Sequence, residues 1–174
     1  MSDVINTSWR YTALDHADSN EAGEIFSVSD LEKMLQNLFS TQQLAVLATQ
    51  GSNGPWGSLV AFSATEDLKQ LVFATGKSTR KYANLKANST VALVMDNRSN
   101  EVEDFQQAIA VTATGQADEV GDADRKRLLS GYLKKHPNLQ TFVSSPSCAL
   151  FRVQLEKLNV VYRFQNVIEL VPAV

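Results

Sequence analysis

Residues 71–81 read Leu71-Val72-Phe73-Ala74-Thr75-Gly76-Lys77-Ser78-Thr79-Arg80-Lys81, an apolar run that meets a small, hydroxylated and basic turn. The apolar residues are typical of a β-strand, and Gly76 provides the backbone freedom that a sharp exit requires. Ser78 and Thr79 are both candidate N-caps for a helix that follows. The stretch therefore predicts a strand, a tight turn and a helix over residues 79–87.

The turn carries the groups that a phosphate monoester requires. Lys77, Arg80 and Lys81 supply positive charge beside two hydroxyl groups and the free N–H groups of a helix N-terminus. Cations at this end of a helix oppose its dipole by roughly a few tenths of a kcal/mol, and a bound anion would offset that cost. The alternative is a solvated basic turn without a ligand. The spacing is not that of a Walker A loop.

Two apolar segments upstream of the turn predict a β-hairpin. They cover residues 44–49 and residues 56–64, and the turn sequence Gly51-Ser52-Asn53-Gly54 separates them. Residues 69–75 form a third strand that leads into the basic turn. Consecutive antiparallel strands joined by tight turns make a meander, which closes into a barrel or splits into a sandwich.

The remaining elements are predicted from apolar patterns of the same kind. Residues 90–96 are apolar at nearly every position, so this strand is expected to be buried on both faces. Ser29 is the candidate N-cap of an amphipathic helix that ends near Phe39, and residues 122–135 carry the pattern of another helix. Further strands are predicted at residues 108–117, 150–155, 159–164 and 167–171.

Composition and charge exclude several classes of protein. The apolar content of 44% is ordinary for a globular chain, and a net charge of −3 does not favour a nucleic-acid partner. No apolar run approaches the roughly 20 residues of a membrane span, and no secretion signal is visible, so a cytoplasmic protein is expected. Residues 1–25 are polar and predict a flexible segment before a single domain over residues 26–174. Cys148 is expected to be buried, and His16 and His136 show no metal-ligand spacing.

A series of short matches runs outward from the basic turn. They are Phe73-Ala74-Thr75, Thr79-Arg80-Lys81, Leu85, Asn88 and Val91-Ala92-Leu93-Val94. Together with the flanking hairpins, over about residues 31–120, this order resembles the FMN-binding split β-barrel family related to pyridoxamine 5'-phosphate oxidase. The resemblance implies a mainly β fold with flanking helices, an antiparallel split β-barrel. It also implies a homodimer that holds FMN in clefts at the subunit interface.

The resemblance also assigns roles to residues. Arg80 and Lys81 match the pair that holds the FMN phosphate, and Thr79 matches the serine that precedes this pair. Backbone groups of the second strand would meet the N5/O4 edge of the isoalloxazine, where hydrogen bonds tune the electron affinity of the ring. The cofactor-binding residues implied in this way are Leu59, Val60, Ala61, Phe62, Thr75, Lys77, Ser78, Thr79, Arg80 and Lys81.

Two departures from the family argue against a true pyridoxamine phosphate oxidase. That enzyme carries an arginine and a lysine in the second strand, whereas residues 56–63 here have no charge. Its carboxy-terminal tryptophan and arginines are also missing, because residues 160–164 contain one arginine and no tryptophan. The implied function is an FMN-dependent oxidoreductase acting on a small molecule, with NADH or NADPH as a candidate electron donor.

Other interpretations stay open. No catalytic acid, base or nucleophile stands out, which fits a non-catalytic flavin-binding or sensor protein. A haem-binding relative would need His16 or His136 as axial ligand, and deazaflavin F420 carries a phosphate that the same turn would bind. We expect His136 to cap a helix end rather than donate a proton. Trp56 either stacks on a flavin or packs at the hairpin rim, with rim packing preferred.

Overall fold

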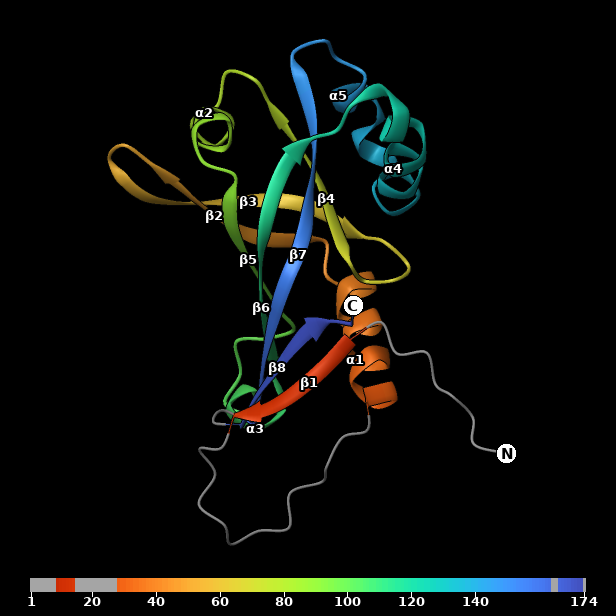
Figure 1. Cartoon of the computed structure of the whole chain (residues 1–174). Helices are drawn as coiled ribbons and strands as arrows, with labels where there is room; N and C mark the ends of the chain where they lie inside the picture. Colours follow the sequence, from red (N-terminus) through yellow and green to blue (C-terminus); the bar gives the residue numbers. More distant parts are fainter. Residues whose placement is uncertain (1–8, 15–27, 164–165, 174) are drawn as a thin grey trace, which may run out of the picture.

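The structure, a computed structural model, describes residues 9–14, 28–163 and 166–173 (Figure 1). The strands are β1 (Trp9–Leu14), β2 (Leu44–Gly51), β3 (Gly54–Ala64), β4 (Gln70–Gly76), β5 (Thr90–Asp96), β6 (Ile109–Glu119), β7 (Cys148–Tyr162) and β8 (Asn166–Pro172). The helices are α1 (Val28–Thr41), α2 (Arg80–Ala87), α3 (Asp104–Gln107), α4 (Asp122–Lys135) and α5 (Gln140–Val143), with a 3₁₀ turn at Pro137–Leu139.

The strands of the described residues form one antiparallel sheet that closes on itself. Its order is β1-β8-β7-β4-β3-β2-β5-β6, and a further pairing between β7 and β6 closes six of these strands into a barrel. The 15-residue β7 pairs with β4 near its start, with β6 over most of its length and with β8 near its end. The predicted antiparallel barrel with flanking helices is therefore confirmed.

Two predictions about the ends of the chain were wrong. The segments at residues 150–155 and 159–164 were expected to be separate strands, but β7 runs without a break from the first into the second and ends at Tyr162, because β6 and β8 pair with its later half. Residues 9–14, placed in the flexible N-terminal segment, form β1, which pairs with β8 and buries Trp9 to 1% exposure. The other residues of that segment lie outside the described ranges.

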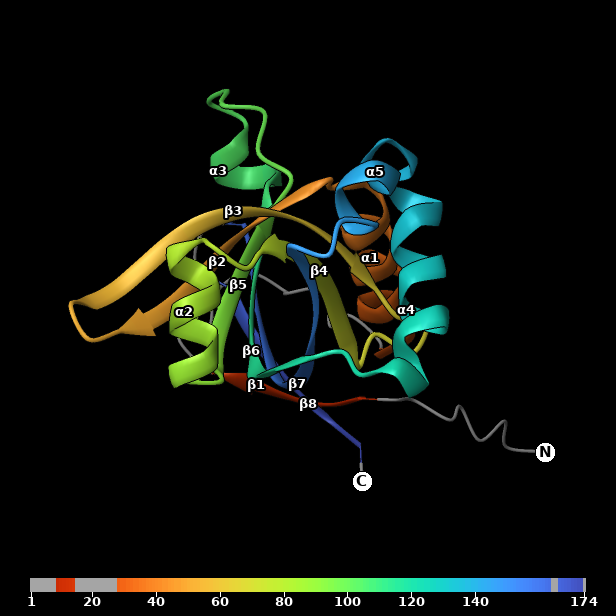
Figure 2. The same cartoon turned by 90° about the horizontal axis from the view of Figure 1, so that it is seen from above.

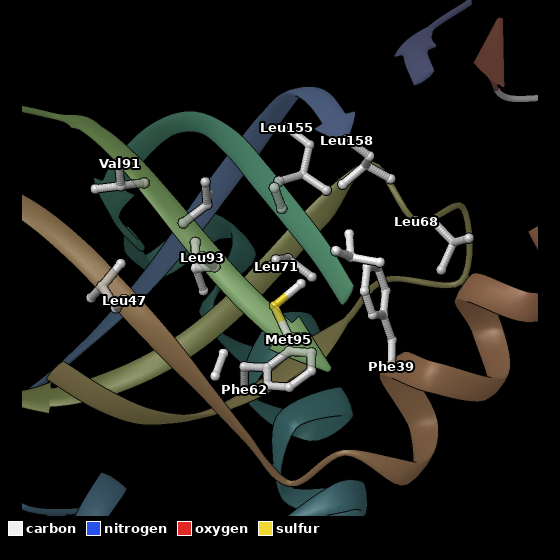
Figure 3. Close-up of a cluster of buried hydrophobic side chains, with 14 of the residues drawn as sticks. Phe39, Leu47, Phe62, Leu68, Leu71, Val91, Leu93, Met95, Leu155 and Leu158 are labelled. Atoms are coloured by element: carbon white, nitrogen blue, oxygen red, sulfur yellow. The ribbon is translucent and has the colours of Figure 1, made fainter. Parts of the chain in front are cut away.

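The barrel interior is filled by aromatic and branched side chains from every side (Figure 3). Phe73 and Phe151 face each other from β4 and β7 with parallel rings 5.6 Å apart. Phe39 from α1 meets Phe62 from β3 edge to face at 6.0 Å. Since Leu35 of α1 is fully buried against the same core, α1 covers the barrel as the amphipathic pattern predicted.

The helices divide between two sides of the barrel. Figure 2 shows α2 on one side and α1, α4 and α5 gathered on the other. Under α4 and α5 lies a second apolar cluster, which includes Tyr132 and the buried Cys148, as expected for that thiol. The α4 bounds match the prediction, whereas α1 begins at Val28, so Ser29 lies inside the helix and is not its cap. None of the helices in the described residues is long and apolar enough to cross a membrane.

Candidate functional site

The basic turn joins β4 to α2 as its sequence predicts, but the expectation for Gly76 was wrong, because its φ is not positive and an added Cβ would meet only the Thr79 Cγ2 atom, at 3.7 Å. Of the two candidate caps, Thr79 caps α2: its backbone is extended and its hydroxyl accepts a hydrogen bond from the Tyr82 N–H at 3.3 Å. The same hydroxyl donates to the Gly76 carbonyl oxygen at 2.8 Å and lies 3.0 Å from the hydroxyl of buried Thr75. The two hydroxyl groups therefore hold the exit of β4 against the first turn of α2.

Within the part of the chain that the structure describes, no carboxylate neutralises the three cations of this turn. The Nζ atom of Lys77 donates to the Pro146 carbonyl oxygen at 3.1 Å, and the Arg80 guanidinium lies 4.2 Å from the centre of the Trp56 ring. Lys81 is half-buried, and Ser78 is exposed. Among the described residues, none of these cations forms an ion pair with a carboxylate. Positive charge thus remains at the end of a helix where the dipole favours an anion.

The stacked pair of Arg80 and Trp56 joins α2 to the β2–β3 hairpin. A small pocket of about 180 Å³ lies between them, lined by the hairpin turn, Arg80 and Asn84. Buried Asn84 donates to the Thr49 hydroxyl of β2 at 3.0 Å, and an added Cβ on Gly51 would lie 2.4 Å from the Asn84 Oδ1. The hairpin is therefore fixed against α2. The Trp56 ring is 44% exposed and packs on Arg80, and the choice between rim packing and stacking on a flavin stays a prediction.

Beside this turn, β3 and β4 separate. Over residues 54–61, β3 pairs with β2, and only over residues 62–64 does it pair with β4. The end of β4 continues past this point along β7 toward the basic turn. In the described residues, no strand therefore covers the second edge of β3 over residues 54–61, and that edge faces the split between the two strands.

The four predicted β3 residues fall into two pairs according to the strand edge toward which their backbone groups point. The Phe62 N–H donates to the Gln43 carbonyl oxygen, so the backbone polar groups of Phe62 point toward β2. The N–H and C=O groups of successive residues point to opposite edges of a strand. Those of Val60 therefore also point toward β2, whereas those of Leu59 and Ala61 point into the split. The side chains of Val60 and Phe62 lie in the core, at 4% and 0% exposure. Of these four predicted residues, Leu59 and Ala61 are therefore the two whose backbone groups point into the split.

The outer face of the hairpin is apolar and exposed. Leu44 and Val46 of β2 and Leu59 of β3 are 52%, 38% and 66% exposed, and Val46 lies opposite both Leu59 and Val94 in the sheet. The expectation that β5 is buried on both faces was wrong, because its burial alternates and Val94 points to this partly exposed face. These neighbouring side chains therefore leave one apolar patch of the hairpin in contact with water.

The C-terminal end of α4 and the residue that follows it, His136, which is the C-cap of this helix, meet the same part of β3. The buried His136 places its Nε2 atom 2.7 Å from the Phe62 carbonyl oxygen, and Tyr132 reaches the Ala61 carbonyl oxygen with its hydroxyl at 3.4 Å. Lys135, between them, donates to the carbonyl oxygens of Phe39 and Gln42 at 2.6 Å each. The only sequence feature that could have indicated these contacts was the spacing of the three residues at the end of an amphipathic helix, and this spacing is typical of ordinary packing.

Two larger hollows lie elsewhere and contain none of the predicted cofactor residues. They hold about 530 and 480 Å³ and share Ser63, Ala64, Thr65, Glu66 and Gly131 among their lining residues. The described residues also contain no group of histidine, cysteine or carboxylate side chains that could hold a metal ion, and His16 lies outside them.

Solved structures share this architecture. A haem-binding protein from Mycobacterium smegmatis superposes with a TM-score of 0.71 at 14% identity over 79% of this chain, which spans 56% of that protein. The haem storage protein HutZ from Vibrio cholerae gives 0.64 at 18% identity, with 76% and 94% of the two chains covered. An FAD-binding protein from Mesorhizobium loti gives 0.59 at 11% identity, with 91% and 97% covered. Identities this low show a shared fold.

A protein-family model extends the likeness to sequence. No curated protein matches the chain. The family model described as pyridoxamine 5'-phosphate oxidase, however, matches residues 31–162, from the first helix through the end of β7. That range contains the whole barrel, the basic turn and the split. The chain therefore belongs to the pyridoxamine 5'-phosphate oxidase family of split β-barrel proteins.

Proposed function

We propose that this protein binds FMN between β3 and the β4–α2 turn and acts as a flavin-dependent oxidoreductase on a small molecule. The observation that carries the proposal is the juxtaposition of two features. Among the described residues, Lys77, Arg80 and Lys81 have no carboxylate partner at the helix N-terminus, and no strand pairs with the neighbouring edge of β3 over residues 54–61. A phosphate linked to a flat, hydrogen-bonding ring matches this combination.

Different residues would bind the phosphate and the ring of the cofactor. Arg80 and Lys81 would bind the phosphate, with the α2 N–H groups that Thr79 and Thr75 hold in place. The backbone of Leu59 and Ala61 would hydrogen-bond the edge of the ring. Bound FMN would supply the electron-transfer chemistry, and the protein would orient the ring and admit the substrate.

A second copy of this chain would complete the site. The exposed apolar face formed by Leu44, Val46 and Leu59 lies next to the split, and burying it against a partner would remove apolar surface from water. We therefore include a homodimer in the proposal, with NADH or NADPH as the electron donor. The uncharged β3, from Pro55 to Ala64, offers no cation to a second phosphate group, so oxidation of pyridoxamine phosphate is not proposed.

Haem is a second candidate because two structural neighbours are named as haem proteins. Haem would need an axial ligand, and His136 is the histidine that lies within the described residues. Since a carbonyl oxygen can only accept, the His136 Nε2 atom carries a proton that it donates to Phe62, and the side chain is 7% exposed. His136 is thus not placed to bind iron through Nε2, and haem binding would need His16, which lies outside the described residues. A non-catalytic flavin protein and an F420-binding protein remain alternatives within the same site.

The visible spectrum of the purified protein, with the mass of any released cofactor, tests the proposal. FMN bands are expected, and Arg80→Ala should weaken FMN binding by about 10- to 100-fold, the loss of a charge-assisted hydrogen bond. Arg127→Ala is the matched control, because this exposed arginine pairs with Asp124 on α4 and should leave FMN affinity unchanged. A colourless protein that also fails to take up added FMN would refute the proposal, and a Soret band would support haem instead.

Oxidation of NADH or NADPH by the FMN-loaded protein in the presence of small acceptors then separates an enzyme from a flavin-binding or sensor protein. Turnover that Arg80→Ala lowers in proportion to its bound flavin supports the oxidoreductase. An FMN-loaded protein that oxidises neither donor would support the non-catalytic alternative.

A further inference from the structure

The ladder between β3 and β4 ends abruptly although neither strand ends there. Its pairs run from Ala64 with Leu71 to Phe62 with Phe73, and the next pair in this register, Ala61 with Ala74, is absent. Both residues still belong to regular strands, since Ala61 pairs with β2 and Ala74 with β7. Something other than strand length must therefore stop the ladder.

The Tyr132 hydroxyl lies beside the missing position. It is 3.4 Å from the Ala61 carbonyl oxygen, on the edge of β3 where Ala74 would pair, and the nearby Ala74 backbone lowers the pKa of the phenol against the larger effect of burial. The distance to Ala61 is long for a hydrogen bond between two oxygen atoms, so this contact is a weak one. Tyr132 is 1% exposed, and burial raises the pKa of its phenol to about 12, so the hydroxyl keeps the proton that it donates.

The neighbouring residues of α4 keep this tyrosine in place. His136 donates to the Phe62 carbonyl oxygen, the next backbone position of β3, and Lys135 donates to two carbonyl oxygens at the end of α1. The Lys135 ammonium also lies 3.9 Å over the Phe62 ring. The last turn of α4 therefore clamps β3 at the point where it changes partner from β2 to β4.

We infer that Tyr132 is a positioning residue that holds the β3–β4 split open by placing its hydroxyl between Ala61 and Ala74. Without the hydroxyl, Ala61 and Ala74 would pair directly, and the Ala61 N–H would be consumed by the Ala74 carbonyl oxygen. The inference rests on the proposed function in one respect, namely that the freed edge of β3 serves the flavin ring. The spacer role itself concerns the ligand-free protein.

Tyr132→Phe tests the inference because it removes the hydroxyl and retains the packed ring. In the ligand-free variant, a crystal structure should show the Ala61 and Ala74 Cα atoms at about 5.5 Å, the separation of a hydrogen-bonded antiparallel pair. FMN affinity should fall by about tenfold, the equivalent of one neutral hydrogen bond. The visible band of the FMN that still binds should shift, because the ring loses its contact with Ala61. Merely structural destabilisation would not move this band.

Tyr82→Phe is the matched control, since it deletes a hydroxyl that contacts Glu119 at 3.3 Å and not the split. It should change neither the strand separation nor the spectrum of bound FMN. An unchanged Ala61–Ala74 separation in Tyr132→Phe would overturn the inference, as would unaltered FMN affinity and spectrum. If the wild-type protein takes up no FMN, the proposed function fails, and the structure of the ligand-free variant alone decides the spacer role.

Discussion

Gly115→Ala should destabilise the barrel severely, for a reason that is visible in the β6–β7 ladder. The register of this ladder shifts between Thr114 and Gly115, so the two backbones approach closely there. A Cβ atom on Gly115 would lie 2.1 Å from the Gln154 carbonyl oxygen and 3.1 Å from the Leu155 Cα atom. Both neighbours are backbone atoms of β7, so no side chain can turn away to make room.

The size of the effect follows from this clash. Real Cβ atoms essentially never approach other heavy atoms closer than 3.0 Å, so β6 and β7 would have to move apart. Overpacking of this kind costs about 1–3 kcal/mol, and a weakened ladder hydrogen bond adds about 1 kcal/mol. A chain of this size loses roughly 2–4 °C in melting temperature for each kcal/mol, so a fall of roughly 10 °C is expected.

Thermal unfolding followed by far-ultraviolet circular dichroism measures this fall, and Gly131→Ala is the control. Gly131 lies in α4 with no atom within 4 Å of an added Cβ, so alanine should stabilise the helix by about 0.5–1 kcal/mol. The two glycines should thus respond in opposite directions. A Gly115→Ala protein that melts within about 2 °C of the wild type would refute the reasoning about the close approach.

Three further predictions concern single side chains. Thr79→Ala should lower the free energy of unfolding in urea by about 1 kcal/mol because α2 loses its N-cap, whereas Thr79→Ser should not; equal losses would contradict this. Burial lowers the pKa of Lys135 to about 8, below the value near 10.4 of an unfolded chain. Between about pH 8 and about pH 10, Lys135 therefore binds more protons in the unfolded chain than in the folded protein. The free energy of unfolding of the wild type, relative to that of Lys135→Met, should rise over this range. A difference that is constant with pH would argue against this. Burial raises the pKa of the Cys148 thiol, so an aromatic disulfide reagent should react far faster after unfolding in urea, and equal rates would reveal an accessible thiol.

The basic turn shows how far sequence alone can reach. Its strand and its helix depend on residues close to one another in the chain, and both formed as predicted. The backbone freedom expected of Gly76 is not used, because its φ is not positive and an added Cβ would meet only the Thr79 Cγ2 atom, at 3.7 Å. The choice of Thr79 over Ser78 as the cap did not follow from propensity, because both residues suit the position. It depends on the Gly76 carbonyl oxygen and the Thr75 hydroxyl, which meet Thr79 only in the folded turn.

Predictions were less complete where partners lie far apart along the chain. Residues 150–155 and 159–164 have the length of two strands, yet β6 and β8 pair with β7 and make it continuous. Trp9 and Tyr11 are isolated apolar residues in a polar segment, and their strand exists because β8 offers an edge to pair with. Local sequence patterns do not predict such pairing, because the free edge of a strand exists only in the assembled sheet.

The sequence by itself therefore determined the hairpin, the basic turn, α2 and α4, because hydrophobic periodicity, turn residues and helix capping act between near neighbours. Only the tertiary structure decided which backbone groups of β3 are free for a ligand. That choice depends on Tyr132 and His136 reaching Ala61 and Phe62 across 71 and 74 positions of the chain. Contacts over such separations arise from the packing of α4 on the closed barrel, and no local preference of these residues encodes them.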